Sequence, residues 1–369
     1  MKIAVTSIAK NESAFVERWF NSALDADLIL LCDTGSTDDT LKQFESLSQN
    51  TNVEAVSHSI NIRPWRFDNA RNTNLALIPD DVDFVIHLDM DEVLVEGWRE
   101  ALEKSYAANP AATRFTYKFI WSWIGDKPGV LFNSDKIHRN GLYTWVHPAH
   151  EVLTYVGDDV ENMVHCDMEI HHHPDNTKPR SQYLDLLEIG VKERPNDDRI
   201  SHYYARELYY RKDYSNSFKE FERHLSLPSA KWDAERAMSM VYMSRMFDDG
   251  RQSMYWARRA VAECPHIRET WLNLATISYK MEYHREVVYA CENAFEIDNR
   301  FSTYISDPQA WGSFLYDIGS VSAHAINRKD LALEWIEHAI ENETNPTEIE
   351  RMNFNKVLYN DNVNHPEKN

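Results

Sequence analysis

Two different periodicities divide this chain, and the change between them limits what it can fold into. Over residues 1–178 short apolar runs alternate with stretches of helical spacing. Over residues 179–345 the strand signals stop and only helical segments follow. Alternating strands and helices predict an α/β domain with a mainly parallel sheet covered on both faces. We therefore expect an α/β domain at 1–178, an all-helical domain at 179–345 and a polar C-terminal tail at 346–369.

Polar clusters follow three of the apolar runs in the first part of the chain. The runs are Ile3–Ile8, Leu28–Cys32 and Phe84–Leu88, and the clusters are Lys10–Glu12, Asp33–Asp38 and Asp89–Glu92. Ligands of open α/β sheets bind at the carboxyl ends of the strands. The three clusters therefore predict one shared site. The strand-rich, aromatic segment 112–170 is expected to add a mixed-sheet extension and the other wall of a cleft.

Two of these clusters begin with an aspartate. Asp89 and Asp91 stand two residues apart at a predicted strand end, so both reach one hard cation such as Mg²⁺ or Mn²⁺. The alternative is a solvated acidic loop. Asp33 opens the run Asp33-Thr34-Gly35-Ser36-Thr37-Asp38, where it either accepts hydrogen bonds from a base or ribose or caps its own turn and the following helix.

The helical part repeats with a period of 34 residues: Ala237, Ala260 and Pro265 recur as Trp271, Ala294 and Asn299. Four helix pairs are predicted: Tyr203–Arg211 with Ser215–Leu225, Ala234–Phe247 with Gln252–Cys264, Glu269–Met281 with Arg285–Ile297, and Trp311–Ile326 with Leu331–Ile340. This period resembles tetratricopeptide repeats. Such repeats suggest contact with a protein, through acceptor recruitment or homodimerisation.

Four motifs together resemble the family 2 glycosyltransferases of the GT-A fold, a Rossmann-like fold of nucleotide-diphospho-sugar transferases. They are Ala9-Lys10-Asn11-Glu12, Asp33-Thr34-Gly35-Ser36-Thr37-Asp38, Asn69-Ala70-Arg71-Asn72 and Leu88-Asp89-Met90-Asp91-Glu92, which match in order, spacing and strand-end placement. They span roughly the first hundred residues. Some bacterial and phage members of the family also carry C-terminal tetratricopeptide-like helices.

The resemblance implies a role for each matching residue. The donor, a nucleotide sugar that is UDP-linked by default, would be held by Ala9, Lys10, Asn11, Glu12, Asp33, Arg71, Asp89 and Met90. Mn²⁺ or Mg²⁺ would be bound by Asp91 with Asp89 close by, and Glu92 would support them from behind. Transfer would invert the anomeric centre, with Glu151 of Trp145-Val146-His147-Pro148-Ala149-His150-Glu151 as the base. An ordinary surface His-Glu pair is the alternative for Glu151.

A histidine after the acceptor-side strands often completes the metal site in GT-A enzymes. The triplet His171-His172-His173 offers one, and we expect His171 or His173, which share a face of the strand. Candidate acceptor or diphosphate contacts are Arg63, Arg66, Trp121, Trp145 and His150, with Trp123 in the same aromatic wall. Arg63 and Arg66 are equally well explained as surface residues.

Composition narrows the alternatives. The formal net charge is −20, which opposes binding to nucleic acid mainly by charge. A phage-type enzyme acting on modified DNA bases therefore needs a basic groove near Lys10, Arg63, Arg66 and Arg71. The acceptor is otherwise open between a saccharide and a protein. A non-catalytic repeat scaffold and a nucleotidyltransferase are further alternatives.

The chain also carries hints of its location. No apolar run approaches the roughly 20 residues of a membrane span, and the N-terminus does not read as a signal peptide. The four cysteines, Cys32, Cys166, Cys264 and Cys291, are far apart, so we expect a reducing, cytoplasmic setting.

Overall fold

The computed structural model of the chain describes residues 1–125, 127–174, 183–300 and 303–360. The chain forms two compact units, Met1–Pro195 and Asn196–Asn369. The first is a mixed α/β sheet domain and the second is helical, so the predicted fold class is confirmed. The predicted boundary at 178/179 lies outside the described residues. The first unit continues through Pro195 because helix α5 (Tyr183–Glu193) belongs to it.

Eight strands form the sheet of the first unit, in the order β3-β2-β1-β4-β9-β6-β12-β5. They are β1 (Ile3–Ala9), β2 (Leu28–Asp33), β3 (Glu54–Ser59), β4 (Phe84–His87), β5 (Glu92–Leu94), β6 (Arg114–Ile120), β9 (Leu131–Arg139) and β12 (Met163–His172). Strands β1 to β4 run parallel, and β9 runs antiparallel to both β4 and β6. Strand β12 is parallel to β6 and antiparallel to β5. A mixed-sheet extension therefore follows the parallel half, as predicted.

Helices and short strands complete the first unit. They are α1 (Val16–Ser22), α2 (Thr40–Ser48), α3 (Phe67–Leu75), α4 (Trp98–Ala108), β7 (Trp123–Ile124) paired with β8 (Lys127–Pro128), and β10 (Tyr143–Val146) paired with β11 (Val152–Tyr155). All six residues of β2 are buried, which explains its continuous apolar run, because a central parallel strand is covered on both faces.

A tryptophan ties the packing of this unit to its strand ends. Trp19 of α1 is fully buried, and its indole N–H donates to the Leu88 carbonyl oxygen over 2.9 Å. A buried indole N–H needs such an acceptor. The bond fixes the backbone directly before Asp89, so the core helps to hold the end of β4 in place.

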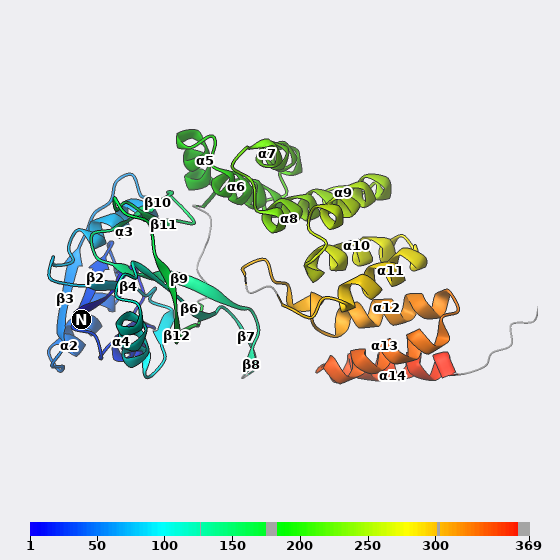
Figure 1. Cartoon of the computed structure of the whole chain (residues 1–369), viewed down its shortest axis with the longest axis horizontal. Coiled ribbons are helices and arrows are strands. Elements are labelled where there is room, and N and C mark those ends of the chain that lie inside the picture. Colours follow the sequence, from blue (N-terminus) through cyan, green and yellow to red (C-terminus); the bar gives the residue numbers. More distant parts are fainter. Residues whose placement is uncertain (126, 175–182, 301–302, 361–369) are drawn as a thin grey trace, which may run out of the picture. The chain divides into compact units, whose positions relative to one another are not determined.

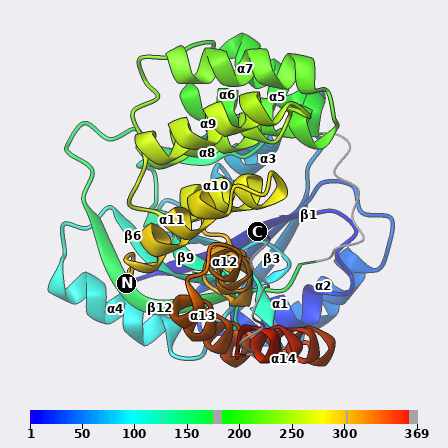
Figure 2. The same cartoon turned by 90° about the vertical axis from the view of Figure 1, so that its right-hand side faces the viewer.

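The second unit consists of helices that run back and forth beside their sequence neighbours (Figures 1 and 2). They are α6 (Asp198–Tyr210), α7 (Tyr214–Ser226), α8 (Asp233–Ser244), α9 (Gly250–Glu263), α10 (Arg268–Lys280), α11 (His284–Phe295), α12 (Ser313–Ala325), α13 (Lys329–Asn342) and α14 (Pro346–Asn360), with the 3₁₀ turn η1 (Pro308–Ala310) before α12. The four predicted helix pairs correspond to α6 with α7, α8 with α9, α10 with α11, and α12 with α13.

The predicted polar tail at 346–369 is wrong for most of its length. Residues Pro346–Asn360 form α14, which packs against α13. Met352 and Tyr359 are buried in the same core as Trp335 and Ile336. The helix covers that core with only two buried side chains, so its apolar periodicity is weak.

Candidate functional site

The ends of the parallel strands bring two predicted motifs together. Ala9 pairs with Asp33 in register, and the Thr34 amide donates to the Ala9 carbonyl oxygen over 2.8 Å. Asp33 is almost completely buried, and its carboxylate accepts hydrogen bonds from the Gly35 and Ser36 amides. Gly35 has φ +106°, a conformation that favours glycine. Asp33 therefore caps its own turn, which is the structural role that the sequence left open.

The loop after β1 is joined to the same turn. The Asn11 amide donates to Ser36 Oγ and the Asn11 side-chain oxygen accepts from the Thr37 amide, both over 2.8 Å. The Glu12 amide donates to Thr40 Oγ1 over 2.7 Å, whereas Lys10 is exposed. Predicted donor-binding residues from two motifs thus form one connected rim along the strand ends.

Asp89 lies between two cations. Its Oδ1 accepts from Arg71 Nη2 over 2.8 Å and its Oδ2 from Lys136 Nζ over 2.7 Å. Lys136 Nζ also donates to Glu92 Oε1 over 3.0 Å, and Glu92 Oε2 accepts from the Asp89 amide over 2.9 Å. Glu92 is buried directly behind Asp89, which is the supporting place that the resemblance implied.

The charges of this cluster stabilise each other. Burial raises the pKa of the Asp89 carboxyl, but Arg71 and Lys136 outweigh it and hold that pKa well below its usual range. Burial lowers the pKa of Lys136, but the negative charges of Asp89 and Glu92 outweigh burial and raise that pKa overall, so the ammonium stays charged. Burial raises the pKa of Glu92. The cluster therefore presents two permanent positive charges at the carboxyl end of β4.

Glu151 joins the cluster through Arg71. Arg71 Nε donates to Glu151 Oε1 over 2.5 Å, so the guanidinium lies between Glu151 and Asp89. Trp145 is buried, and the Arg71 guanidinium carbon lies 4.8 Å from the centroid of its ring. Trp145 thus supports Arg71 from within the protein, and the expectation that it stacks on a sugar or acceptor is wrong.

The histidine triplet is oriented differently from the prediction. His172 Nε2 lies 3.3 Å from Asp91 Oδ2, and His172 Nδ1 donates to the Trp121 carbonyl oxygen over 2.9 Å. Antiparallel pairing of β12 with β5 sets His172 opposite Glu92 and so beside the acidic motif. The rings of His171 and His173 instead pack against the ring of Trp123. Of the three histidines, His172 is therefore the one that lies beside Asp91.

Asp91 and His172 form a pair that fits a divalent cation. Burial lowers the pKa of His172, but its bonds to Asp91 and to the Trp121 carbonyl raise it overall. A histidine whose second nitrogen is fixed by a carbonyl is typical of metal ligands. Two protein ligands leave positions for phosphate oxygens, as is usual for Mg²⁺. Among the described residues, groups of three potential ligands close enough to share one ion occur only in the helical unit.

Four other candidate contacts occupy different surroundings. Arg66 pairs with Asp68 over 2.8 Å and with Glu193 of α5 over 2.6 Å, so its charge is paired within the first unit. Arg63 is exposed and donates to Asn61. The His150 ring stacks on Tyr183, whereas the exposed Trp121 stacks on His172 at a centroid distance of 4.3 Å. Of these four residues, only Trp121 therefore borders the pair formed by Asp91 and His172.

Lys136 was missed in the sequence because it stands in β9, a strand that precedes no motif. A second group without a sequence signal is the buried pair His87 of β4 and His138 of β9, whose Nε2 atoms are 3.0 Å apart. The Trp145 indole nitrogen lies 3.3 Å from His87 Nε2. Trp145, which also packs against Arg71, therefore connects this buried histidine pair to the cluster.

Comparison with known proteins gives distant structural matches. No family model and no curated protein matches the chain. A structure of S. aureus TarS residues 1–349 in complex with UDP-GlcNAc has 12% sequence identity and a TM-score of 0.39, covering 89% of this chain and 92% of that one. A longer TarS structure matches with 13% identity and a TM-score of 0.36, covering 72% of this chain, which spans about half (53%) of its length.

The helical part has its own matches. A tetratricopeptide repeat protein of Thermus thermophilus, TTC0263, has 14% identity and a TM-score of 0.32, and the match covers 47% of this chain and 89% of that one. Separately, no helix in the described ranges is long and apolar enough to cross a lipid bilayer.

Proposed function

We propose that the first unit is a glycosyltransferase domain of the GT-A type that uses a nucleotide-sugar donor. The observation that carries this proposal is the cluster around Asp89, where Arg71 and Lys136 are held at the carboxyl end of the parallel strands. Arg71, Asp89 and Glu92 of this cluster stand in the motifs that resemble family 2 glycosyltransferases, and Lys136 is added from β9. Fixed cations at such an edge suit the negative charge that develops on a departing diphosphate.

The charge balance of the site supports a metal-dependent reaction. Asp89, Asp91, Glu92 and Glu151 contribute four carboxylates, whereas Arg71 and Lys136 contribute two permanent cations, so the carboxylates outnumber these cations by two (4 − 2 = 2). A diphosphate would be repelled by this surplus. Mn²⁺ or Mg²⁺ held by Asp91 and His172 would remove the surplus and neutralise the leaving diphosphate.

The remaining roles follow from the contacts of each side chain. Glu151 is the carboxylate proposed to remove the acceptor's proton, and the bond from Arg71 Nε orients it. Arg71 is held in turn by Asp89 and by the Trp145 ring, so it links the proposed base to the proposed donor site. Trp121 borders the metal pair with an exposed ring, where an apolar sugar face could stack.

The helical unit is proposed to contact a protein, either the acceptor or a second copy of the chain. A UDP-linked donor, inversion at the anomeric carbon and a cytoplasmic setting belong to the same proposal and rest on the family resemblance and the sequence. The acceptor class is left to experiment.

The decisive experiment is donor hydrolysis by the full chain, with a panel of UDP-sugars and Mn²⁺, followed by product analysis. A glycosyltransferase releases UDP and free sugar slowly when water replaces the acceptor, and chelation of Mn²⁺ should stop the release. Pyrophosphate from a nucleoside triphosphate would instead identify a nucleotidyltransferase. A chain that binds none of the donors would support a non-catalytic scaffold.

A further inference from the structure

The helical unit contains a cavity of about 300 Å³ that the proposed transferase reaction does not use. Its walls come from α6, α8 and the segment before α12, and the rings of Tyr209, Tyr242 and Tyr304 line it. All of its lining residues belong to Asn196–Asn369. The volume lies at the lower end of the range for small-molecule sites. The cavity is therefore large enough for one compact ligand.

Arg206 of α6 borders this cavity with an unusual lack of partners. Its guanidinium carbon lies 4.2 Å from the centroid of the Tyr203 ring, and it has no hydrogen bond or ion pair with any residue that the structure describes. Elsewhere in the same unit, carboxylates pair with Arg223, Arg236, Arg258 and Arg351. A guanidinium has five N–H donors. No nitrogen of Arg206 is among the fully buried polar atoms that lack a partner in the described ranges, so these donors face the open cavity.

A second guanidinium lines the same cavity. Arg245, directly after α8, donates from Nε to Asn273 Oδ1 over 2.9 Å and forms no ion pair within the described part of the chain. Two carboxylates also line the cavity, Glu269 and Asp307, but among the described residues neither forms an ion pair with Arg206 or Arg245. Glu269 accepts from the Asp307 amide and the Trp311 indole, and Asp307 accepts from the Gln309 amide. The cavity thus offers two arginines whose charges no neighbouring carboxylate takes up.

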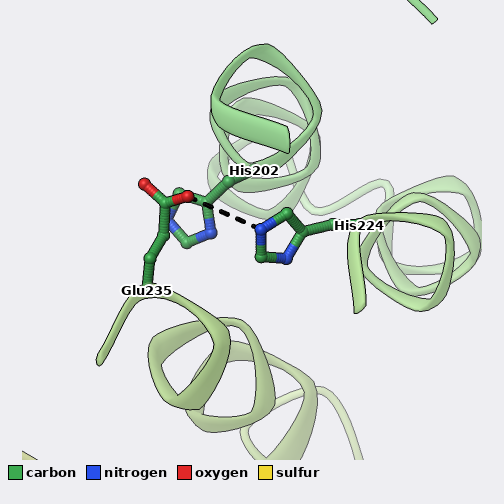
Figure 3. Close-up of side chains that lie close together, drawn as sticks. All are labelled: His202, His224 and Glu235. Carbon is green, nitrogen blue, oxygen red and sulfur yellow. Dashed lines mark ion pairs between the residues drawn. The ribbon is translucent and has the colours of Figure 1, made fainter. Parts of the chain in front are cut away.

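His202, which lines the cavity, lies close to the buried side chains of His224 and Glu235 (Figure 3). His202 Nδ1 lies 2.8 Å from Ser239 Oγ, which lies 2.9 Å from His224 Nδ1. His224 Nε2 is 3.5 Å from Glu235, which also accepts from the Tyr304 hydroxyl. Burial lowers the pKa of His202 to about 3 and keeps it neutral. The network fixes His202 and Tyr304, so this side of the cavity is prearranged.

We propose that this cavity binds a small ligand carrying a phosphate or carboxylate group, with Arg206 and Arg245 as the donors to its oxyanion. The planar guanidinium matches both groups through paired N–H donors. The tyrosine rings would flank the rest of the ligand. Their hydroxyl groups also line the cavity, and those of Tyr210 and Tyr242 lie 3.0 Å apart. A phosphorylated sugar or an acidic sugar has this combination of features.

Calorimetry on the full chain tests this site with four probes: glucose 6-phosphate, inorganic phosphate, glucuronate and glucose. Binding of glucose 6-phosphate with inorganic phosphate as competitor would assign a phosphate, and binding of glucuronate would assign a carboxylate. Glucose, which has no charge, should not bind. The proposal is overturned if neither anionic sugar binds, or if glucose binds as well as they do.

Variants locate the binding. R206Q should weaken the anionic sugar by about tenfold or more, the effect of losing a charged hydrogen bond. R259Q is the matched control, because Arg259 is exposed and also packs on an aromatic ring, Trp256, at 4.6 Å outside the cavity. R245Q is a second variant that should also weaken binding of the anionic sugar. It keeps the test valid if R206Q lowers the unfolding temperature of the chain.

The control for the transferase site is D91A, which should lose metal-dependent UDP binding and still bind the anionic sugar. Failure of the two proposals is therefore distinguishable. Equal affinity in the parent, R206Q and R245Q would overturn the cavity assignment.

Discussion

The buried histidine His138 should make the first unit sensitive to acid. It lies on β9 with no exposed surface, its Nδ1 donates to the Arg139 carbonyl oxygen over 2.9 Å, and its Nε2 faces His87. Burial lowers the pKa of His138 to about 4 from its usual 6.5, and the charge of Arg114 adds to this, although the bond to the Arg139 carbonyl opposes it. The folded state therefore resists protonation at this position.

The direction and size of the effect follow from proton linkage. Above pH 6.5 both folded and unfolded chains hold His138 neutral, so the group makes no pH-dependent contribution. Below pH 6.5 the unfolded chain takes up the proton first, and stability falls until the folded state also protonates near pH 4. A shift of about 2.5 units at about 1.36 kcal/mol each, less the part already titrated, gives a loss of about 3 kcal/mol at pH 4.

Urea unfolding of the first unit within the full chain, at pH 7.5 and pH 4, measures this loss. H138N keeps a donor for the Arg139 carbonyl but removes the titrating ring, so its loss between the two pH values should be smaller than that of the parent by up to about 3 kcal/mol. His58 is exposed on β3, and H58N should behave as the parent does. Equal pH dependence in the parent and H138N would refute the reasoning.

Three further predictions concern single contacts. D91A should lose Mn²⁺-dependent UDP binding in calorimetry while its circular dichroism stays that of the parent; equal UDP affinity would remove Asp91 as a ligand. K136M should lower the free energy of unfolding by roughly 3–5 kcal/mol because it leaves the buried Glu92 without its cation and Asp89 with Arg71 alone. K118M, which breaks a half-exposed pair with Glu169, should cost no more than about 1 kcal/mol in the same denaturation assay. M352A should lower the free energy of unfolding by about 2–5 kcal/mol, because Met352 of α14 is buried. F354A, on the exposed face, should lower it by about 0.5 kcal/mol or less. Equal melting temperatures for M352A and F354A would show that α14 does not pack as described.

The sequence predicted the elements whose signal is local. The apolar runs before each polar cluster identified the parallel strands, because a strand buried on both faces needs continuous apolar residues. The 34-residue period identified the helix pairs, because each pair repeats the same packing. Residues 346–360 lacked such a signal. Only Met352 and Tyr359 of α14 are buried, and they are seven residues apart, too few for a recognisable apolar face.

The positions of His172 and Lys136 in the site depend on contacts between strands that are distant in sequence. Alternation along β12 separates His172 from His171 and His173, but it does not say which face meets the acidic motif. The pairing of His172 with Glu92 settles this, and it depends on the antiparallel register of β5. Lys136 reaches Asp89 only because β9 is inserted beside β4. No local spacing connects these residues.

The proposed base gives the most direct test of the central claim, that the strand-end cluster transfers sugar. With Mn²⁺ and the UDP-sugar identified by the donor screen, turnover of E151Q should fall by roughly 10²–10⁴-fold, the usual contribution of a general base. Its UDP affinity should stay within a few fold of the parent, because the amide keeps the shape of the side chain. The control D158N alters an exposed carboxylate after β11 and should keep parental turnover. Parental turnover in E151Q, together with an inactive D158N, would contradict the account and move the base to the loop after Tyr155.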